Sequence, residues 1–134
     1  MINVNQEMCL TEALEDLIFV QGNARQIVSG GQGASADQVR QYSFAMVDEV
    51  TEWAKEMGWK DWKPDPAMTD ERRQRILDEF ADIIAFFGTL SELTALKTGA
   101  TPDEIAAAYT KKVQINLKRF AGEVEGYGVR RVVG

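Results

Sequence analysis

The chain has 134 residues, the size of one domain, and 45% of them are apolar, so we expect a single domain spanning residues 1–134 with one hydrophobic core. Its net charge of −6 argues against binding to nucleic-acid polymers, which demand a basic surface. The absence of histidine excludes His-based zinc sites and Ser-His-Asp triads, so chemistry must depend on carboxylates, lysines, arginines, hydroxyls or Cys9.

The chain start and the cysteine content bear on the compartment. Cys9 is the only cysteine, so no intrachain disulfide can form, and we expect a cytoplasmic protein. The first residues lack the basic and apolar regions of a secretory signal. The longest uncharged apolar run, residues 83–91, falls short of the roughly 20 residues that cross a bilayer, so we expect no membrane association.

The periodicity of apolar residues predicts a first helix over about residues 6–28. It ends at the segment Ser29-Gly30-Gly31-Gln32-Gly33, which is flexible. This segment could be read as a phosphate-binding glycine loop. A linker is favoured, because no Lys-Ser/Thr pair follows it and no strand precedes it.

A second helix is predicted from near Ser35 to Met57. Ser35 and Gln38 fit the pattern of a capping box, and Gly58 is the stop. The two prolines at 64 and 66 forbid a regular helix in the segment that follows.

Two further helices complete an all-α, four-helix bundle. The third runs from about residue 69 or 70 to 97, is the most apolar part of the chain and is expected to be the central core helix, ending at Gly99. The fourth begins with Thr101 as cap, Pro102 at the first helical position and Glu104 completing a capping box, and it reaches about residue 121 or 124.

Two pairs of acidic residues on the second and third helices are candidate metal ligands: Glu49 with Glu52, and Glu79 with Asp82. Residues at i and i+3 share a helix face, so four carboxylates converge if the two helices pack side by side. Such an arrangement persists only with cations among the carboxylates, and a set of oxygen ligands alone favours Mg²⁺, or Mn²⁺.

Four solvated surface charges are the alternative interpretation, since an ExxE pair is common. The second pair is more telling, because Glu79 and Asp82 are interleaved with large apolar residues, where an uncompensated charge is costly. A carboxylate-bridged di-iron bundle is a weak alternative, because those sites use Glu-x-x-His and the chain has no histidine.

The fourth helix carries a concentration of basic residues. Lys112, Asn116 and Arg119 share one helical face, which could meet a triphosphate, with arginine suited to bidentate contact. A solvated basic face near a helix C-terminus is the alternative, and the helix dipole favours it.

These patterns together resemble the all-α nucleoside triphosphate pyrophosphatases, which include MazG proteins, dCTP pyrophosphatases and dimeric dUTPases. The two acidic pairs match the metal motif of that superfamily. Other segments are similar to the dimeric dUTPase branch: Gly58-Trp59-Lys60-Asp61-Trp62-Lys63, Tyr109-x-x-Lys112-x-x-x-Asn116-x-x-Arg119, Gly126-Tyr127 and Gln21. The similarity covers roughly residues 17–127.

The resemblance implies a role for each matched residue. Glu49, Glu52, Glu79 and Asp82 would hold Mg²⁺, and Glu49 would also orient or deprotonate the attacking water. The phosphate contacts would come from Lys112, Arg119 and Tyr127. The base and sugar contacts would come from Gln21, Trp62 and Asn116. The reaction would convert dUTP to dUMP and pyrophosphate in a homodimer or tetramer, and the short chain is typical of phage or small bacterial members.

Two departures from the branch bear on the substrate. Ala85 stands where the branch often has a histidine, and Tyr127 lies farther from Arg119 than is usual. A dUTP diphosphatase is the leading hypothesis, and because of these departures a MazG-like enzyme acting on dCTP or on several nucleoside triphosphates is the alternative. A non-catalytic helical interaction module is the third hypothesis.

Overall fold

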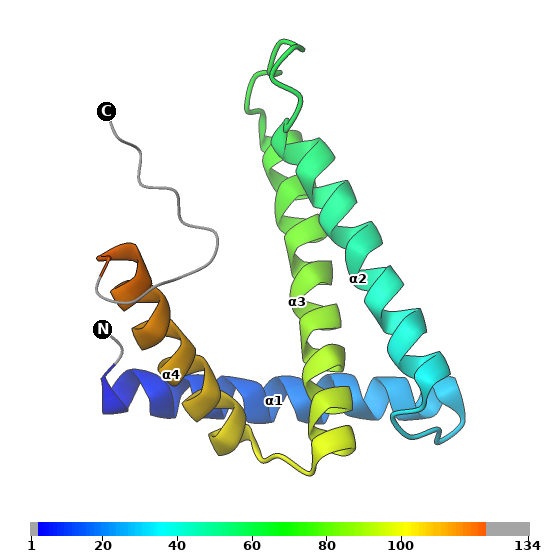
Figure 1. Ribbon diagram of the computed structural model, residues 1–134. Helices are drawn as coiled ribbons and strands as arrows, with labels where there is room; N and C mark the ends of the chain where they lie inside the picture. The colour runs from blue at the N-terminus through cyan, green and yellow to red at the C-terminus, as the bar shows by residue number, and fades with distance from the viewer. Residues whose placement is uncertain (1–2, 123–134) are drawn as a thin grey trace. The chain divides into compact units, whose positions relative to one another are not determined.

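The computed structural model describes residues 3–122, which form four helices and no strand (Figure 1). The helices are α1 Val4–Ser29, α2 Ala36–Met57, α3 Asp70–Thr98 and α4 Pro102–Phe120. The predicted all-α class is confirmed. The chain divides into two compact units, residues 16–99 and residues 1–15 with 100–134. The single domain therefore stays a prediction.

Both ends of α3 and the start of α4 lie close to their predicted positions. The Thr69 side chain accepts a hydrogen bond from the Arg72 N–H, and Gly99 ends α3 with φ of 73° in the left-handed region. Thr101 and Glu104 form the reciprocal capping box of α4, with Pro102 in its first turn. These boundaries depend on a few neighbouring residues, which is why the sequence alone locates them.

The start of α2 differs in one respect from the predicted capping box. Ser35 Oγ accepts a hydrogen bond from the Gln38 N–H, as expected. The Gln38 side chain does not complete the box, because its Oε1 accepts a hydrogen bond from Arg25 Nη1 at 3.0 Å. A tertiary contact has replaced the local one, and Gln38 is buried as a result. Gly58 ends α2 in the left-handed region, as predicted.

Within residues 16–99, α2 and α3 form an antiparallel hairpin (Figure 1). Tyr42 faces Phe86 with ring centroids 6.2 Å apart, and farther along Trp53 faces Phe80 at 6.3 Å. These tilted aromatic pairs fix the register of the two helices. Glu49, Glu52 and Asp82 lie between the two pairs in the chain, and Glu79 immediately precedes Phe80.

The second half of α1 passes very close to α3 in the same unit. A Cβ atom on Gly88 of α3 would lie 2.7 Å from Gln21 Cγ, and one on Gly22 of α1 would lie 2.8 Å from Glu92 Cγ. Glycine at both positions therefore permits the crossing. It brings Gln21 and its neighbours to the face of the α2–α3 hairpin.

The middle of α3 is not the buried core that its composition predicted. Leu77, Phe80, Ile84 and Phe87 are 43–47% exposed. The buried residues of α3 are Arg72 near its start and the run from Gly88 to Leu93, apart from the half-buried Leu90. The expectation is wrong for the isolated chain, because α2 covers only one face of this stretch.

In the other unit, Leu14 and Ala106 are buried, with exposed fractions of 2% and 0%. Among the described residues, no helix combines the length and the apolar character that a membrane crossing requires.

Candidate metal centre and flanking pockets

Three of the four predicted metal ligands meet between α2 and α3. Glu49 of α2 and Glu79 and Asp82 of α3 each offer a carboxylate oxygen, and these oxygens all lie within 4.8 Å of one another. Glu49 and Glu79 are half-buried, and Asp82 is exposed. We call these three residues the carboxylate cluster. Their placement follows from the antiparallel register of the two helices.

The electrostatics of the carboxylate cluster are unfavourable without a cation. The pKa of Glu49 is raised above its ordinary value, first by burial and then by the negative charges of Asp82 and Glu79. A hydrogen bond to Glu79 and the charge of Glu52 raise this pKa further. A proton on Glu49 relieves the repulsion, and a divalent cation would relieve it more completely. The donor set is all carboxylate oxygen, which fits Mg²⁺ or Mn²⁺.

Glu52 lies outside this group. Its side chain is 55% exposed, and its Oε1 atom is 3.5 Å from Lys55 Nζ. Glu52 faces Lys55 rather than the three residues of the cluster. It could join the other carboxylates only by leaving that contact.

A cavity of about 230 Å³ adjoins the carboxylate cluster at Asp82. It is lined by Gln21, Ala24, Arg25, Val28, Tyr42, Asp82, Ala85, Phe86 and Thr89. We call it the Gln21 pocket. Gln21 was expected to contact a base or sugar, and the small side chain of Ala85 leaves room in the same cavity. Asp82 belongs to both the pocket and the cluster, so a ligand could touch both.

Sequence reasoning did not single out Tyr42, Thr89 or Arg25 as pocket residues. One signal was present for Tyr42, which precedes Glu49 by seven residues and so shares its helix face. Arg25 and Thr89 carried no such signal, because the crossing of α1 over α3 places them in the wall.

Arg25 lines the Gln21 pocket and forms a buried hydrogen-bond network. Its Nε and Nη2 atoms donate to the two carboxylate oxygens of Glu92 at 2.6 and 2.8 Å. Its Nη1 atom donates to Gln38 Oε1 at 3.0 Å and to the Gln32 carbonyl at 2.9 Å. The hydrogen bond to Glu92 raises the pKa of Arg25, which burial alone would lower. All three guanidinium nitrogen atoms donate hydrogen bonds, so the role of Arg25 is to hold α1, α2 and α3 together.

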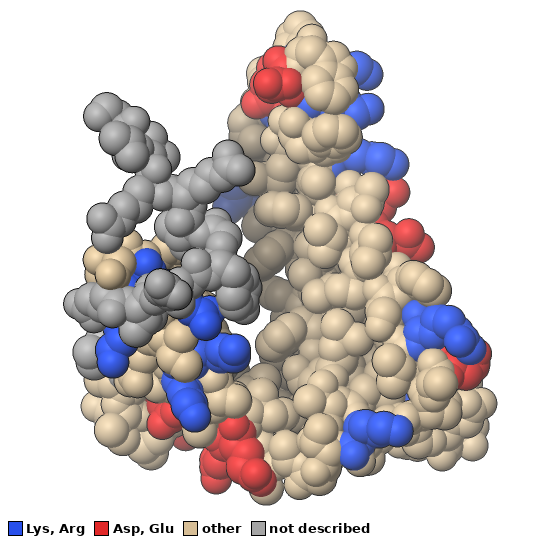
Figure 2. Space-filling model, in the orientation of Figure 1, with Lys and Arg blue, Asp and Glu red and all other residues tan. Residues whose placement is uncertain are grey.

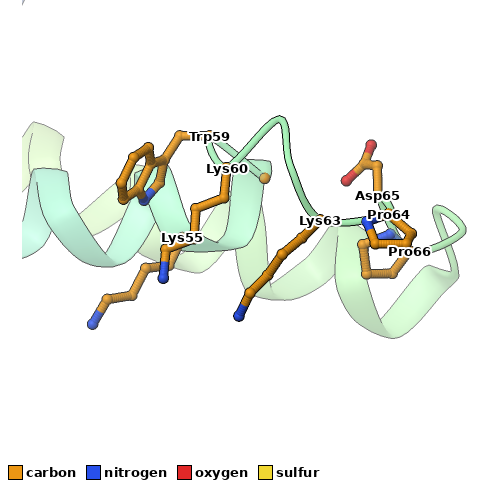
Figure 3. Close-up of a pocket in the computed structure, with 8 residues that line it drawn as sticks. Lys55, Trp59, Lys60, Lys63, Pro64, Asp65 and Pro66 are labelled. Carbon is orange, nitrogen blue, oxygen red and sulfur yellow. The ribbon is translucent and has the colours of Figure 1, made fainter.

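A second cavity, of about 260 Å³, lies at the C-terminal end of α2 and in the loop that follows (Figure 3). It is lined by Lys55, Gly58, Trp59, Lys60, Lys63, Pro64, Asp65 and Pro66. We call it the lysine pocket. Trp62 is not in its lining. It is 66% exposed and packs edge-on against Trp59, with ring centroids 5.5 Å apart.

Gln21 and Trp62, both expected to contact the base or sugar, lie at opposite ends of α2. Gln21 shares its pocket with Tyr42, whereas Trp62 lies in the loop beyond Gly58. At 1.5 Å per residue, the helix from Tyr42 to Gly58 spans about 24 Å. One nucleoside cannot contact both side chains of a single chain. The two roles are therefore incompatible unless Trp62 comes from another copy.

The predicted phosphate ligands lie in the other unit or outside the described residues, and Asn116, expected to contact the base or sugar, also lies in the other unit. Lys112 and Asn116 are exposed on α4, and Arg119 is half-buried there. Basic side chains gather over α4 in Figure 2, in keeping with the predicted basic face. Tyr127 lies outside the described residues. The approach of these residues to the carboxylate cluster stays a prediction.

Comparison of the chain with protein-family models, with curated proteins and with solved structures gave no match.

Proposed function

We propose that the chain is a Mg²⁺-dependent nucleoside triphosphate diphosphatase and that dUTP, converted to dUMP and pyrophosphate, is its first substrate. The observation that carries this proposal is the convergence of Glu49, Glu79 and Asp82 from two helices within 4.8 Å. Three carboxylates in such proximity, one with a raised pKa, are expected at a cation site.

The cation fits the chemistry of the proposed reaction. A bound Mg²⁺ ion offsets the charge on phosphate oxygens and increases the acidity of water. Cleavage of a phosphoanhydride requires little covalent participation by the protein, so the absence of histidine is no obstacle.

The chain's own residues would bind and orient the substrate. Glu49 would orient the attacking water or accept its proton, as the half-buried member of the cluster on α2. The Gln21 pocket would receive the nucleoside, since it opens beside Asp82. Ala85 leaves this pocket larger than a histidine would, which favours the alternative of a MazG-like enzyme acting on dCTP or on several nucleoside triphosphates.

Cell location and assembly belong to the same proposal. We infer a cytoplasmic enzyme, because the single exposed cysteine suits a reducing compartment. We infer a homodimer, because the middle of α3 exposes large apolar side chains that a second copy would cover.

The deciding experiment is pyrophosphate release from a panel of nucleoside triphosphates with Mg²⁺, alongside calorimetric titration of the metal. Faster turnover of dUTP than of dCTP supports the first proposal. Equal turnover of the two supports the MazG-like alternative. If no pyrophosphate is released and no metal binds, the non-catalytic helical interaction module is the remaining hypothesis.

A further inference from the structure

We propose that the lysine pocket binds the diphosphate end of the nucleotide, the part that leaves as pyrophosphate. This inference rests on the proposed function and names a phosphate subsite within one chain. It concerns Lys55, Lys60 and Lys63, which line one cavity at the end of α2.

The charge of the pocket suits a polyanion, although the chain as a whole carries −6. The three lysine side chains extend to the same side of the loop, and Asp65 points away from them (Figure 3). Asp65 accepts a hydrogen bond from Arg72 Nη2 at 2.8 Å, so its charge is already compensated. Lys63 has no ion pair with any described residue, and Lys60 lies 5.5 Å from the Trp59 ring centroid.

The pocket is a built feature of the fold. Arg72 is 5% exposed and donates hydrogen bonds to the Glu56 carbonyl, to the Pro66 carbonyl and to Asp65. These bonds tie the loop to the ends of α2 and α3. Gly58 permits the closure, because a Cβ atom there would lie 2.6 Å from Asp65 Oδ1. The lysines therefore project from a backbone that is already held in place, which reduces the cost of ordering the site.

Lys55 is the member of the lysine pocket that lies nearest to the carboxylate cluster in the chain. Lys55 follows Glu49 by six residues, about 9 Å along the helix. Lys55 contacts Glu52, whose charge acts on Glu49. The Gln21 pocket adjoins the cluster on the other side, at Asp82. A nucleotide with its phosphates at the carboxylate cluster would thus extend its terminal phosphates along α2 toward Lys55, the nearest lysine of the pocket.

The test is calorimetric titration of inorganic pyrophosphate in EDTA, so that binding cannot depend on a metal ion. The variant carries Lys60→Gln and Lys63→Gln. The matched control carries Arg40→Gln and Lys97→Gln, which remove the same charge from exposed positions outside the pocket. We expect the pocket variant to raise the pyrophosphate Kd by about tenfold or more, since charge-assisted contacts are lost. The control should stay close to wild type.

Equal Kd values for wild type and the pocket variant, or an equal loss in the control, would overturn the inference. With Mg²⁺ and substrate, the pocket variant should raise KM and leave the Mg²⁺ affinity unchanged. An active pocket variant with wild-type KM would show that the lysine pocket is not the phosphate subsite, and the proposed function would still stand. Lysine-dependent pyrophosphate binding in a chain that hydrolyses no nucleotide would instead overturn the proposed function.

Discussion

Arg25 of α1 donates two hydrogen bonds, of 2.6 and 2.8 Å, to the carboxylate of Glu92 on α3, and both side chains are almost completely buried. Removing one member of such a pair leaves a buried charge without its partner. We therefore expect Glu92→Gln to lower the free energy of unfolding by about 3–5 kcal/mol. Chemical denaturation measures this loss. Glu12→Gln, at an exposed position, is the control and should change stability little. An equal effect of the two substitutions would contradict a structural role for the pair.

Asp82→Asn should abolish nucleotide hydrolysis and preserve the fold. Asp82 contributes to the carboxylate cluster and to the Gln21 pocket, so its charge serves both the cation and the substrate. Pyrophosphate release and circular dichroism are the measurements. Asp78→Asn is the matched control on the same helix, since Asp78 is exposed and accepts a hydrogen bond from Gln74, outside the cluster. Wild-type rates in the Asp82 variant would count against the site.

The metal-free protein should lose stability as the pH rises through the raised pKa of Glu49. The sign follows from linkage: the folded state binds this proton more tightly than the unfolded state, so protonation favours folding. The contribution is complete below the ordinary pKa of a glutamate and disappears above the raised one. Melting temperatures in EDTA measure this effect.

Glu49→Gln should flatten the pH dependence and raise the melting temperature of the metal-free protein at neutral pH, because it removes one of the clustered charges. Saturating Mg²⁺ should stabilise the wild type and have much less effect on the variant. A variant that keeps the full pH dependence would assign the titration to another group.

Ala85→Leu should raise the KM for nucleotides and leave Mg²⁺ binding unchanged. Ala85 lines the Gln21 pocket, whose volume is about 230 Å³, and a larger side chain would occupy space that the nucleoside requires. Ala81→Leu is the control, because Ala81 is exposed and lies outside the pocket. If both variants bind nucleotide like wild type, the base and sugar lie elsewhere.

The chain should form a homodimer at micromolar concentration. Phe80, Ile84 and Phe87 are 43–47% exposed in the single chain, and pairing would remove this apolar surface from water. Light scattering gives the mass directly. Phe87→Glu should shift the equilibrium toward the monomer. A wild-type protein that is monomeric at micromolar concentration would reject the prediction.

Helix ends are the part of the fold that the sequence specifies most directly. Thr69, Gly99, Thr101 and Glu104 make contacts with residues only a few positions away, so their identity is sufficient to locate α3 and α4. The i and i+3 spacing of the acidic pairs likewise places each pair near one face of its own helix.

The relation between helices was decided only by tertiary packing. The rotation and register of α2 against α3 determine that Glu49, Glu79 and Asp82 meet and that Glu52 faces Lys55. The crossing of α1 pairs Arg25 with Glu92, across 67 positions of the chain. Local preferences cannot encode such contacts, because they depend on which surfaces pack together once several helices bury their apolar faces at the same time.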